Sequence, residues 1–287
     1  MNSPIGVLPV IQPIITYDVA IEIKETEMRR TCSAALTVCA LVAFLILSGC
    51  YQRVQFPVVV DAPPEPAIIP PPAQYKIIGK SVQGRPMTSL ALGQGPDVTF
   101  ILATIHGNEP AGTPLVRRLS AHLRQNPELL DGRKVVLLRV ANPDGLAHNS
   151  RFNAHGVDLN RNFEAANRLN SKQTGLTGLS EPESRAIRQI ILQHKPDRIV
   201  SIHQPLNCID YDGPAQALAE NMGQYCNLPV KKLGARPGSL GSYAGVTLGI
   251  PIITFEMTGA DSQLSSEALW RKYGKSLLAA IVFPDAI

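Results

Sequence analysis

A histidine and a glutamate three residues apart are the first residues of this chain whose spacing could bind a metal. His106 and Glu109 offer an imidazole nitrogen and a carboxylate oxygen. Because the chain contains six histidines, an HxxE pair alone is weak evidence. His203 would complete the His₂Glu set of catalytic zinc sites, which keep one position open for water. The alternative for His203 is a core histidine whose hydrogen bonds are satisfied.

Three predicted strands place candidate residues at their ends. They cover residues 98–105 (VTFILATI), 198–202 and 251–255 (PIITF). The first is a continuous apolar run, which is typical of a strand buried on both faces of a sheet. His106 directly follows the first segment, His203 the second and Glu256 the third, so each is expected at the end of a strand. Ligands bind at the carboxyl ends of strands in open α/β sheets, so we expect these side chains at one edge.

Helical patterns alternate with these strands and indicate the fold class. A further strand is predicted at 134–140, followed by polar residues at 142–145, and helices are predicted at 113–130, 214–225 and 264–281. Ser180 and Glu183 have the spacing of a capping box, which predicts a helix start there. Strands alternating with helices predict an α/β fold, with a largely parallel central sheet and helices on both faces. We assign residues 74–287 to this single catalytic domain.

The composition is that of a globular protein and argues against a nucleic-acid partner. The chain has 287 residues, is 45% hydrophobic and 17% charged, and carries a formal net charge of +4. Such a chain can bury a substantial core. Its basic residues are scattered, whereas nucleic-acid-binding proteins gather them on one face with aromatic residues between them. We therefore expect no nucleic acid among the partners.

Residues 1–49 are organised like a secretory signal. A basic Met-Arg-Arg at 28–30 precedes an uncharged apolar run at 31–47, and Leu-Ser-Gly-Cys ends at Cys50. This ending resembles the bacterial lipoprotein box, in which the cysteine is lipidated and becomes the first mature residue. Met28 is the predicted true start, since signal peptides rarely carry a long segment before their basic residues. The alternative is a transmembrane anchor or a plain signal, although the apolar run is short for a bilayer.

A proline-rich segment follows the predicted lipid site. Residues 50–73 contain seven prolines, a composition that favours an extended, semi-rigid tether. Tyr51 stands where an inner-membrane retention signal usually has aspartate, so the resemblance to such lipoproteins favours the outer membrane. We expect a periplasmic protein anchored to the membrane by a lipid on Cys50.

Two of the five cysteines, Cys208 and Cys226, lie outside the signal and the lipid site. An oxidising periplasm permits a disulfide between them. Two buried free thiols are the alternative, and alkylation with and without reductant distinguishes the two.

Four motifs occur in order along the predicted domain. They are HGNE at 106–109, NPDG at 142–145, GVDLNRNF at 156–163 and TFE at 254–256. With Arg151 in an Arg-Phe-Asn segment, this set resembles the zinc carboxypeptidase family, and the resemblance runs from about residue 77 to residue 283. It implies a mixed, largely parallel sheet as the fold, and peptide or amide hydrolysis with one Zn²⁺ per chain as the chemistry.

The resemblance implies a set of binding residues. His106, Glu109 and His203 would be the zinc ligands. Asn160 and Arg161 would bind the free terminal carboxylate of the substrate, since the planar fork of arginine suits a carboxylate. The alternative for Asn160 and Arg161 is a solvated loop pair.

The resemblance also implies catalytic residues. Arg151 would stabilise the oxyanion that forms when the scissile carbonyl becomes tetrahedral. Glu256 would take a proton from the attacking water and deliver it to the leaving amine, with a strand-end salt bridge as the alternative. Asp158 is interpreted as a group that orients His106, or else as a turn-forming aspartate. Tyr243 lies only thirteen positions before Glu256, which fits a specificity loop better than a catalytic tyrosine.

Within the family, the motifs are most similar to those of amidases that act on murein peptides. The first hypothesis is therefore cleavage of the amide between γ-D-glutamate and meso-diaminopimelate, which has a free carboxylate beside the scissile bond. Asp210, Asp212 and Arg236 are candidates for binding its distal zwitterionic end. No acidic residue lies at 238–241 to select a simple basic side chain.

Two other hypotheses remain open. One is a carboxypeptidase of other short peptides with a free terminal carboxylate, or a deacylase of acyl-amino acids. The other is a catalytically dead, lipid-anchored murein-binding protein, against which the complete set of matched residues argues.

Overall fold

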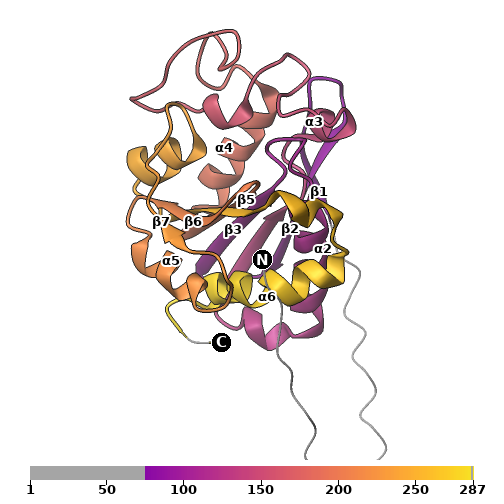
Figure 1. The fold of residues 1–287 in the computed structure, drawn as a ribbon, viewed down its shortest axis with the longest axis vertical. Helices are drawn as coiled ribbons and strands as arrows, with labels where there is room; N and C mark the ends of the chain where they lie inside the picture. The colour runs from indigo at the N-terminus through magenta and orange to yellow at the C-terminus, as the bar shows by residue number, and fades with distance from the viewer. Residues whose placement is uncertain (1–74, 286) are drawn as a thin grey trace, which may run out of the picture. The chain divides into compact units, whose positions relative to one another are not determined.

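A computed structural model of the chain describes residues 75–285 and 287, which fall in one unit. Figure 1 shows the fold. Its eight-stranded sheet has the order β1-β2-β4-β3-β5-β8-β6-β7. The strands are β1 Lys76–Lys80, β2 Pro86–Gly93, β3 Asp97–Ala103, β4 Arg133–Leu138, β5 Arg198–His203, β6 Leu206–Asp212, β7 Val230–Lys231 and β8 Ile252–Thr258. The predicted signal, Cys50 and the predicted tether lie outside the described residues.

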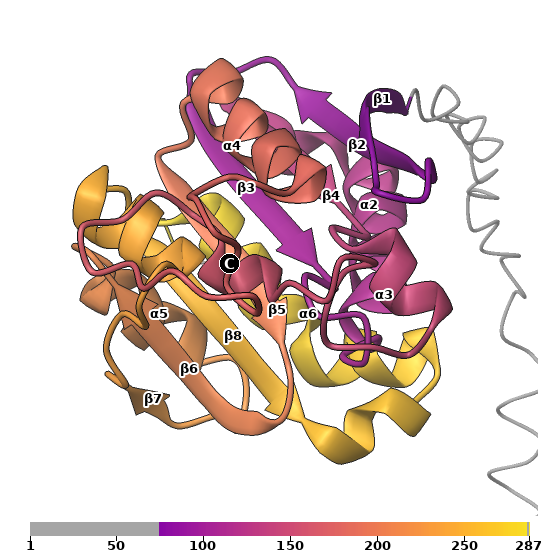
Figure 2. The same cartoon turned by 90° about the horizontal axis from the view of Figure 1, so that it is seen from above.

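Helices cover both faces of this sheet. The α-helices are α2 Gly112–Gln125, α3 Pro143–Ala147, α4 Pro182–His194, α5 Gln216–Gly223 and α6 Ser266–Val282. Shorter helical segments are η1 Pro127–Leu130, η2 Leu159–Arg161, η3 Gly241–Thr247 and η4 Gly259–Gln263. Helices α2, α5 and α6 lie on one face, and α4 lies on the other (Figure 2). In the part of the chain described here, no helix has the length and apolar content needed to cross a membrane.

The apolar run of β3 shows why the sheet needs cover on both faces. Side chains alternate along a strand, so Ile101 and Ala103 enter the core under α2, α5 and α6, while Phe100 and Leu102 enter the core under α4. All four side chains are buried. The predicted α/β fold with helices on both faces is confirmed.

The sheet is mixed, and only part of it was predicted from the sequence. Among the described strands, four neighbouring pairs are parallel and three are antiparallel. Strands β1, β2, β6 and β7 were not predicted. β1 is largely exposed, and β6 buries two aspartates among its apolar residues, so neither gives a continuous apolar run.

Two predicted boundaries were wrong for identifiable reasons. The helix predicted to reach residue 130 ends at Gln125, because Pro127 lacks an amide hydrogen and begins η1 instead. Strand β8 continues to Thr258, which pairs with Leu206 of β6. Glu256 therefore lies within the strand and not at its end.

The predicted capping box at the start of α4 is also wrong. The N-cap of α4 is Glu181, and no side chain caps the helix. The hydroxyl of Ser180 donates to Glu181 Oε1 at 2.8 Å, and Glu183 Oε1 accepts from the amide of Val82 at 3.0 Å. These carboxylates connect α4 to neighbouring loops in place of capping it.

Of the two alternatives for the cysteines, the structure has free thiols. Cys208 is buried in β6, opposite Glu256 of β8. The thiol of Cys226 lies 3.9 Å from the carbonyl oxygen of Met222.

Candidate active site

One cavity of about 340 Å³ is lined by every residue predicted to bind metal or substrate or to act in catalysis within the described chain. These residues are His106, Glu109, Arg151, Asn160, Arg161, His203, Asp210, Asp212, Arg236 and Glu256. They come from the ends of β3 and β5, from β6 and β8, from the loop that ends in η2 and from the segment between β7 and η3. The cavity lies at the carboxyl ends of parallel strands, as expected for an α/β sheet.

The turn after β3 directs the first two candidate ligands toward the cavity. Thr104 is buried and has a φ of 56°, a left-handed conformation that is strained for a β-branched residue. Gly107 follows, and a Cβ atom there would lie 1.9 Å from the carbonyl carbon of Gly145. The HGNE and NPDG motifs therefore pack backbone against backbone, which leaves His106 and Glu109 facing inward.

Two imidazoles converge on one carboxylate. His106 Nδ1 lies 2.8 Å from Glu109 Oε1, and His203 Nδ1 lies 3.0 Å from Glu109 Oε2. The ligand atoms of the three buried residues lie within 4.8 Å of one another. The other ring nitrogens are occupied, His106 Nε2 by Asp158 Oδ1 at 3.1 Å and His203 Nε2 by Ser201 Oγ at 2.9 Å. Both Nδ1 atoms are thereby oriented, and the donor set fits zinc.

The electrostatics of this cluster favour a bound cation. Burial raises the pKa of Glu109, but the hydrogen bonds from His106 and His203 outweigh it and hold the pKa well below the usual range. Burial likewise opposes ionisation of Asp158, yet its bond to His106 and the charge of Arg151 bring the pKa to about 2. Burial lowers the pKa of His106, and its bonds to Asp158 and Glu109 raise it overall. Two ionised carboxylates are thus buried around the candidate metal position.

The loop between α3 and η2 carries the polar groups beside the metal position. Arg151 Nε donates to Asp158 Oδ2 at 3.0 Å, so Asp158 links Arg151 to the candidate ligand His106. Asn160 Oδ1 accepts from the amide of Leu240 at 2.8 Å, which ties this loop to the chain before η3. These contacts fix the loop at the cavity wall.

Positive charge is in excess on this side of the cavity. Burial lowers the pKa of Arg161, Asp158 opposes the shift, and the charges of Arg151 and Arg236 add to it. All three guanidinium groups line the same cavity. An arrangement of this kind binds a substrate that carries carboxylates.

Glu256 lies in β8 between two neighbouring strands, opposite His203 of β5 and Cys208 of β6. Its side chain is buried, and Oε2 accepts from the amide of Leu206 at 3.3 Å. Burial raises the pKa of this carboxyl group above its usual range. A carboxyl group with a raised pKa is suited to accept and return a proton.

Some groups at the site were not predicted. Ser201 precedes His203 by two residues and therefore faces the same side of β5, a spacing that could have identified it. The amide of Gln204 donates to Glu109 Oε2 at 3.2 Å, and no sequence pattern signals this contact. Tyr243 does not line the cavity. It is buried in η3, and its ring stacks on Phe163 with 5.8 Å between ring centroids.

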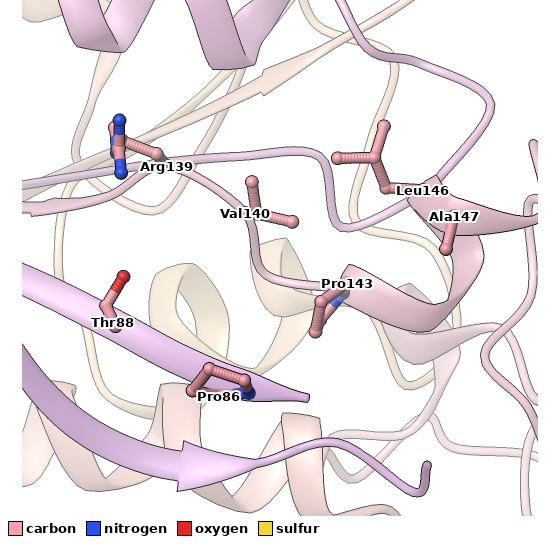
Figure 3. A pocket seen from close by; sticks show the side chains of 7 residues that line it. All are labelled: Pro86, Thr88, Arg139, Val140, Pro143, Leu146 and Ala147. Atoms are coloured by element: carbon pink, nitrogen blue, oxygen red, sulfur yellow. The ribbon is translucent and has the colours of Figure 1, made fainter. Parts of the chain in front are cut away.

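A separate hollow lies beside β2 and α3 (Figure 3). It is lined by Pro86, Thr88, Arg139, Val140, Pro143, Leu146 and Ala147. Arg139 is the only ionisable residue in that lining, and its guanidinium lies over the Tyr75 ring, 4.8 Å from the centroid. This hollow has no group for acid–base or metal chemistry.

The fold and the donor set define a zinc hydrolase of the carboxypeptidase type, and comparison places the chain in a known family. The sequence profile of the zinc carboxypeptidase family matches residues 69–224. The chain belongs to this family, which uses Zn²⁺, and it is a metal-dependent peptidase or amidase.

Individual proteins of known name or structure allow a more detailed comparison. The chain is 36% identical to murein peptide amidase A of Escherichia coli over 222 residues, which cover 71% of this chain and 88% of the relative. The crystal structure of murein-tripeptide amidase MpaA from E. coli O157 matches with a TM-score of 0.61 and 32% identity, covering 73% of this chain and 91% of that one. Carboxypeptidase A of Helicoverpa armigera matches with a TM-score of 0.62 at 22% identity, covering 74% and 70%, which shows the shared fold.

Proposed function

We propose that the protein hydrolyses murein peptides at the amide between γ-D-glutamate and meso-diaminopimelate. The observation that carries the proposal is the single cavity that holds a zinc-binding donor set, a buried carboxyl group and three arginines. The choice of substrate is supported by relatives named murein peptide amidase A, which match over most of their length.

Asn160 and Arg161 position the substrate. The diaminopimelate end of the peptide has a free carboxylate next to the scissile amide, and Arg161 can bind it with two parallel hydrogen bonds. Arg161 Nη1 also donates to its neighbour's carbonyl, the backbone oxygen of Asn160, at 2.6 Å, which restricts the side chain before substrate arrives. Binding the carboxylate places the amide beside the candidate metal ligands.

Arg151 and Glu256 perform the chemical step. Glu256 takes the proton of the attacking water as the oxygen bonds to the carbonyl carbon, and Arg151 stabilises the negative charge on the carbonyl oxygen. The carbon–nitrogen bond then breaks, and Glu256 returns the proton to the leaving amine. Zinc held by His106, Glu109 and His203 would polarise the carbonyl and make water a better nucleophile.

A basic carboxypeptidase activity is the second candidate, because one observation favours it. Asp210 and Asp212 line the cavity, although no acidic residue lies in the 238–241 segment. Carboxylates on this wall could bind a lysine side chain. The dead murein-binding protein is disfavoured, because Glu256 and Arg151 both reach the cavity.

A substrate panel tests the proposal. The purified protein is incubated with L-Ala-γ-D-Glu-meso-diaminopimelate, with peptides ending in lysine or arginine, and with acyl-amino acids. The proposal predicts that kcat/KM is highest for the diaminopimelate tripeptide. A higher kcat/KM for the peptides ending in lysine or arginine would indicate a basic carboxypeptidase instead.

We also propose that the protein is anchored in the periplasm by a lipid on Cys50. The support is the lipoprotein-like ending at Cys50 and the proline-rich residues after it. Labelling cells with palmitate should mark the parent and leave the Cys50→Ser variant unlabelled. Label on the variant would refute the anchor, and separation of the two membranes would test the outer-membrane assignment.

A further inference from the structure

Asp212 is a buried carboxylate that has no hydrogen-bond donor among the described residues. Its exposed fraction is 6%, yet it lines the active-site cavity. By contrast, Oδ1 of its neighbour Asp210 accepts from the amides of Leu233 at 2.8 Å and Tyr211 at 2.9 Å. A carboxylate that receives no donor from the protein must take one from water or from a ligand in the cavity.

The backbone of η3 packs closely against one side of Asp212, which also lines the cavity. A Cβ atom on Gly241 would lie 2.1 Å from Asp212 Oδ2, and one on Gly245 would lie 2.7 Å from Asp212 Cβ. The backbone of η3 therefore packs directly against this side chain. Lys232, the cation whose charge acts on Asp212, lies over the Tyr211 ring and makes no ion pair with Asp212.

The register between β6 and β8 relates Asp212 to the catalytic end of the cavity. Cys208 pairs with Glu256, Asp210 with Thr254 and Asp212 with Ile252. Alternate residues share a face, so the two aspartates follow one another on the face that carries Glu256. Asp210 and Asp212 therefore lie along the cavity wall that leads away from Glu256.

Arg236 provides the opposite charge on the same cavity. It lines the cavity together with Asp212, and no ion pair within 4.0 Å is formed by its guanidinium among the residues that the structure describes. Its charge acts on Asp210 and on Arg161. The cavity thus offers an unpaired anion and an unpaired cation beyond the groups used in the chemical step.

Building on the proposed function, we propose that Asp212 and Arg236 bind the distal amino-acid head group of meso-diaminopimelate. Asp212 accepts hydrogen bonds from the ammonium group, and Arg236 pairs with the carboxylate beside it. Lysine has the ammonium without that carboxylate, and norleucine has neither. The two residues therefore select a zwitterionic side chain over a basic or an apolar one.

The proposed head-group site can be tested by measuring the binding of free amino acids, which requires no catalytic turnover. Calorimetry with the full-length, zinc-loaded protein measures the Kd of meso-diaminopimelate, L-lysine and L-norleucine. The parent should bind them in that order of decreasing affinity. Asp212→Asn should weaken diaminopimelate and lysine by about 10- to 100-fold, the range for losing a charged hydrogen bond, and leave norleucine unchanged. Arg236→Gln should weaken diaminopimelate alone.

Matched controls are Asp131→Asn and Arg271→Gln, which change exposed residues outside the cavity. Thermal melts confirm folding, which Asp212→Asn should not impair because it removes a buried charge without a donor. If Asp212→Asn keeps the parent's Kd ratios while the tripeptide is cleaved, this inference is wrong and the proposed function stands. If the ratios change as expected but the tripeptide is not cleaved, the head-group site stands and the proposed function is wrong.

Discussion

Two glutamates in one cavity have opposite electrostatic environments. Glu109 accepts hydrogen bonds from two imidazoles, so its pKa is lowered and it stays ionised as a metal ligand should. Glu256 accepts only the amide of Leu206 among the described residues, and burial raises its pKa. Glu109 is therefore suited to metal binding, and Glu256 is suited to proton transfer.

Glu256→Gln should separate these two roles. Glutamine keeps the shape but cannot take a proton, so kcat should fall by about 10²- to 10⁴-fold, the usual contribution of a general acid or base. Zinc content, measured by atomic absorption, should not change. Glu128→Gln, at an exposed position in η1, is the control. Full activity in Glu256→Gln would exclude it as the proton carrier.

Ser201→Ala should weaken metal binding, although Ser201 is not itself a candidate metal ligand. The serine oxygen lies 2.9 Å from His203 Nε2 and orients the ring. Loss of such a partner typically costs about 10- to 100-fold in metal affinity. Competition with a chromogenic chelator measures the zinc Kd, and an unchanged value would show that packing alone orients His203.

Asp212 makes the stability of the protein depend on pH. Burial, with the charge of Asp210 adding to it, raises the pKa of Asp212 from 3.8 to about 6. The folded state therefore binds this proton more tightly than the unfolded state, and stability falls as pH rises through that window. Asp212→Asn should be more stable than the parent by about 1–2 kcal/mol at pH 7.5, and equal to it below pH 4. Urea unfolding at both pH values measures this, and equal stabilities at pH 7.5 would contradict it.

At the scale of elements, the start of α4 holds the substrate-binding loop. Asn153 Nδ2 donates to Glu181 Oε2 at 2.7 Å and to Glu183 Oε2 at 3.1 Å. Its Oδ1 accepts from the amides of His155 at 3.1 Å and Val157 at 3.0 Å. The segment that carries Arg151, Asp158, Asn160 and Arg161 is therefore fastened to a helix outside the cavity.

Asn153→Ala should disturb substrate binding from a distance. The variant leaves two buried carboxylates short of a donor, so we expect a loss of about 2–4 kcal/mol in stability. KM should rise more than kcat falls, because the arginine that holds the substrate carboxylate is displaced. The exposed residue Asn227 provides the control variant Asn227→Ala. A loss of stability with unchanged KM would mean that the contact is structural alone.

The strands that can be predicted from the sequence are those that have an apolar core on both faces of the sheet. The segments at 98–105, 198–202 and 251–255 each place apolar side chains in the cores on both faces of the sheet, so they are rich in apolar residues. β6 escaped prediction because Asp210 and Asp212 face the cavity and interrupt its pattern. The spacing of Ser180 and Glu183 suggested a cap, but Glu183 bonds to Val82, a residue distant in sequence that no local pattern could indicate.

At the scale of the molecule, one apolar core packs against each face of the sheet, and the active-site residues come together at the carboxyl ends of its strands. The motifs predicted the metal ligands, Arg151, Arg161 and Glu256 as candidates, because each occupies a matched position in a family pattern. The unpaired state of Asp212 could not be predicted, since it depends on how η3 packs against β6. Asp210 and Asp212 of β6 lie in one cavity with Arg236, which belongs to the segment between β7 and η3.

The most direct test of the account is the product of one reaction. Full-length protein and its Glu256→Gln variant are incubated with L-Ala-γ-D-Glu-meso-diaminopimelate, the products are identified by mass spectrometry, and bound metal is counted. We predict free meso-diaminopimelate from the parent and none from the variant, with about one zinc per chain in both. A zinc-loaded parent that leaves the tripeptide intact would contradict the proposed substrate, and a parent that binds no zinc would contradict the metal site.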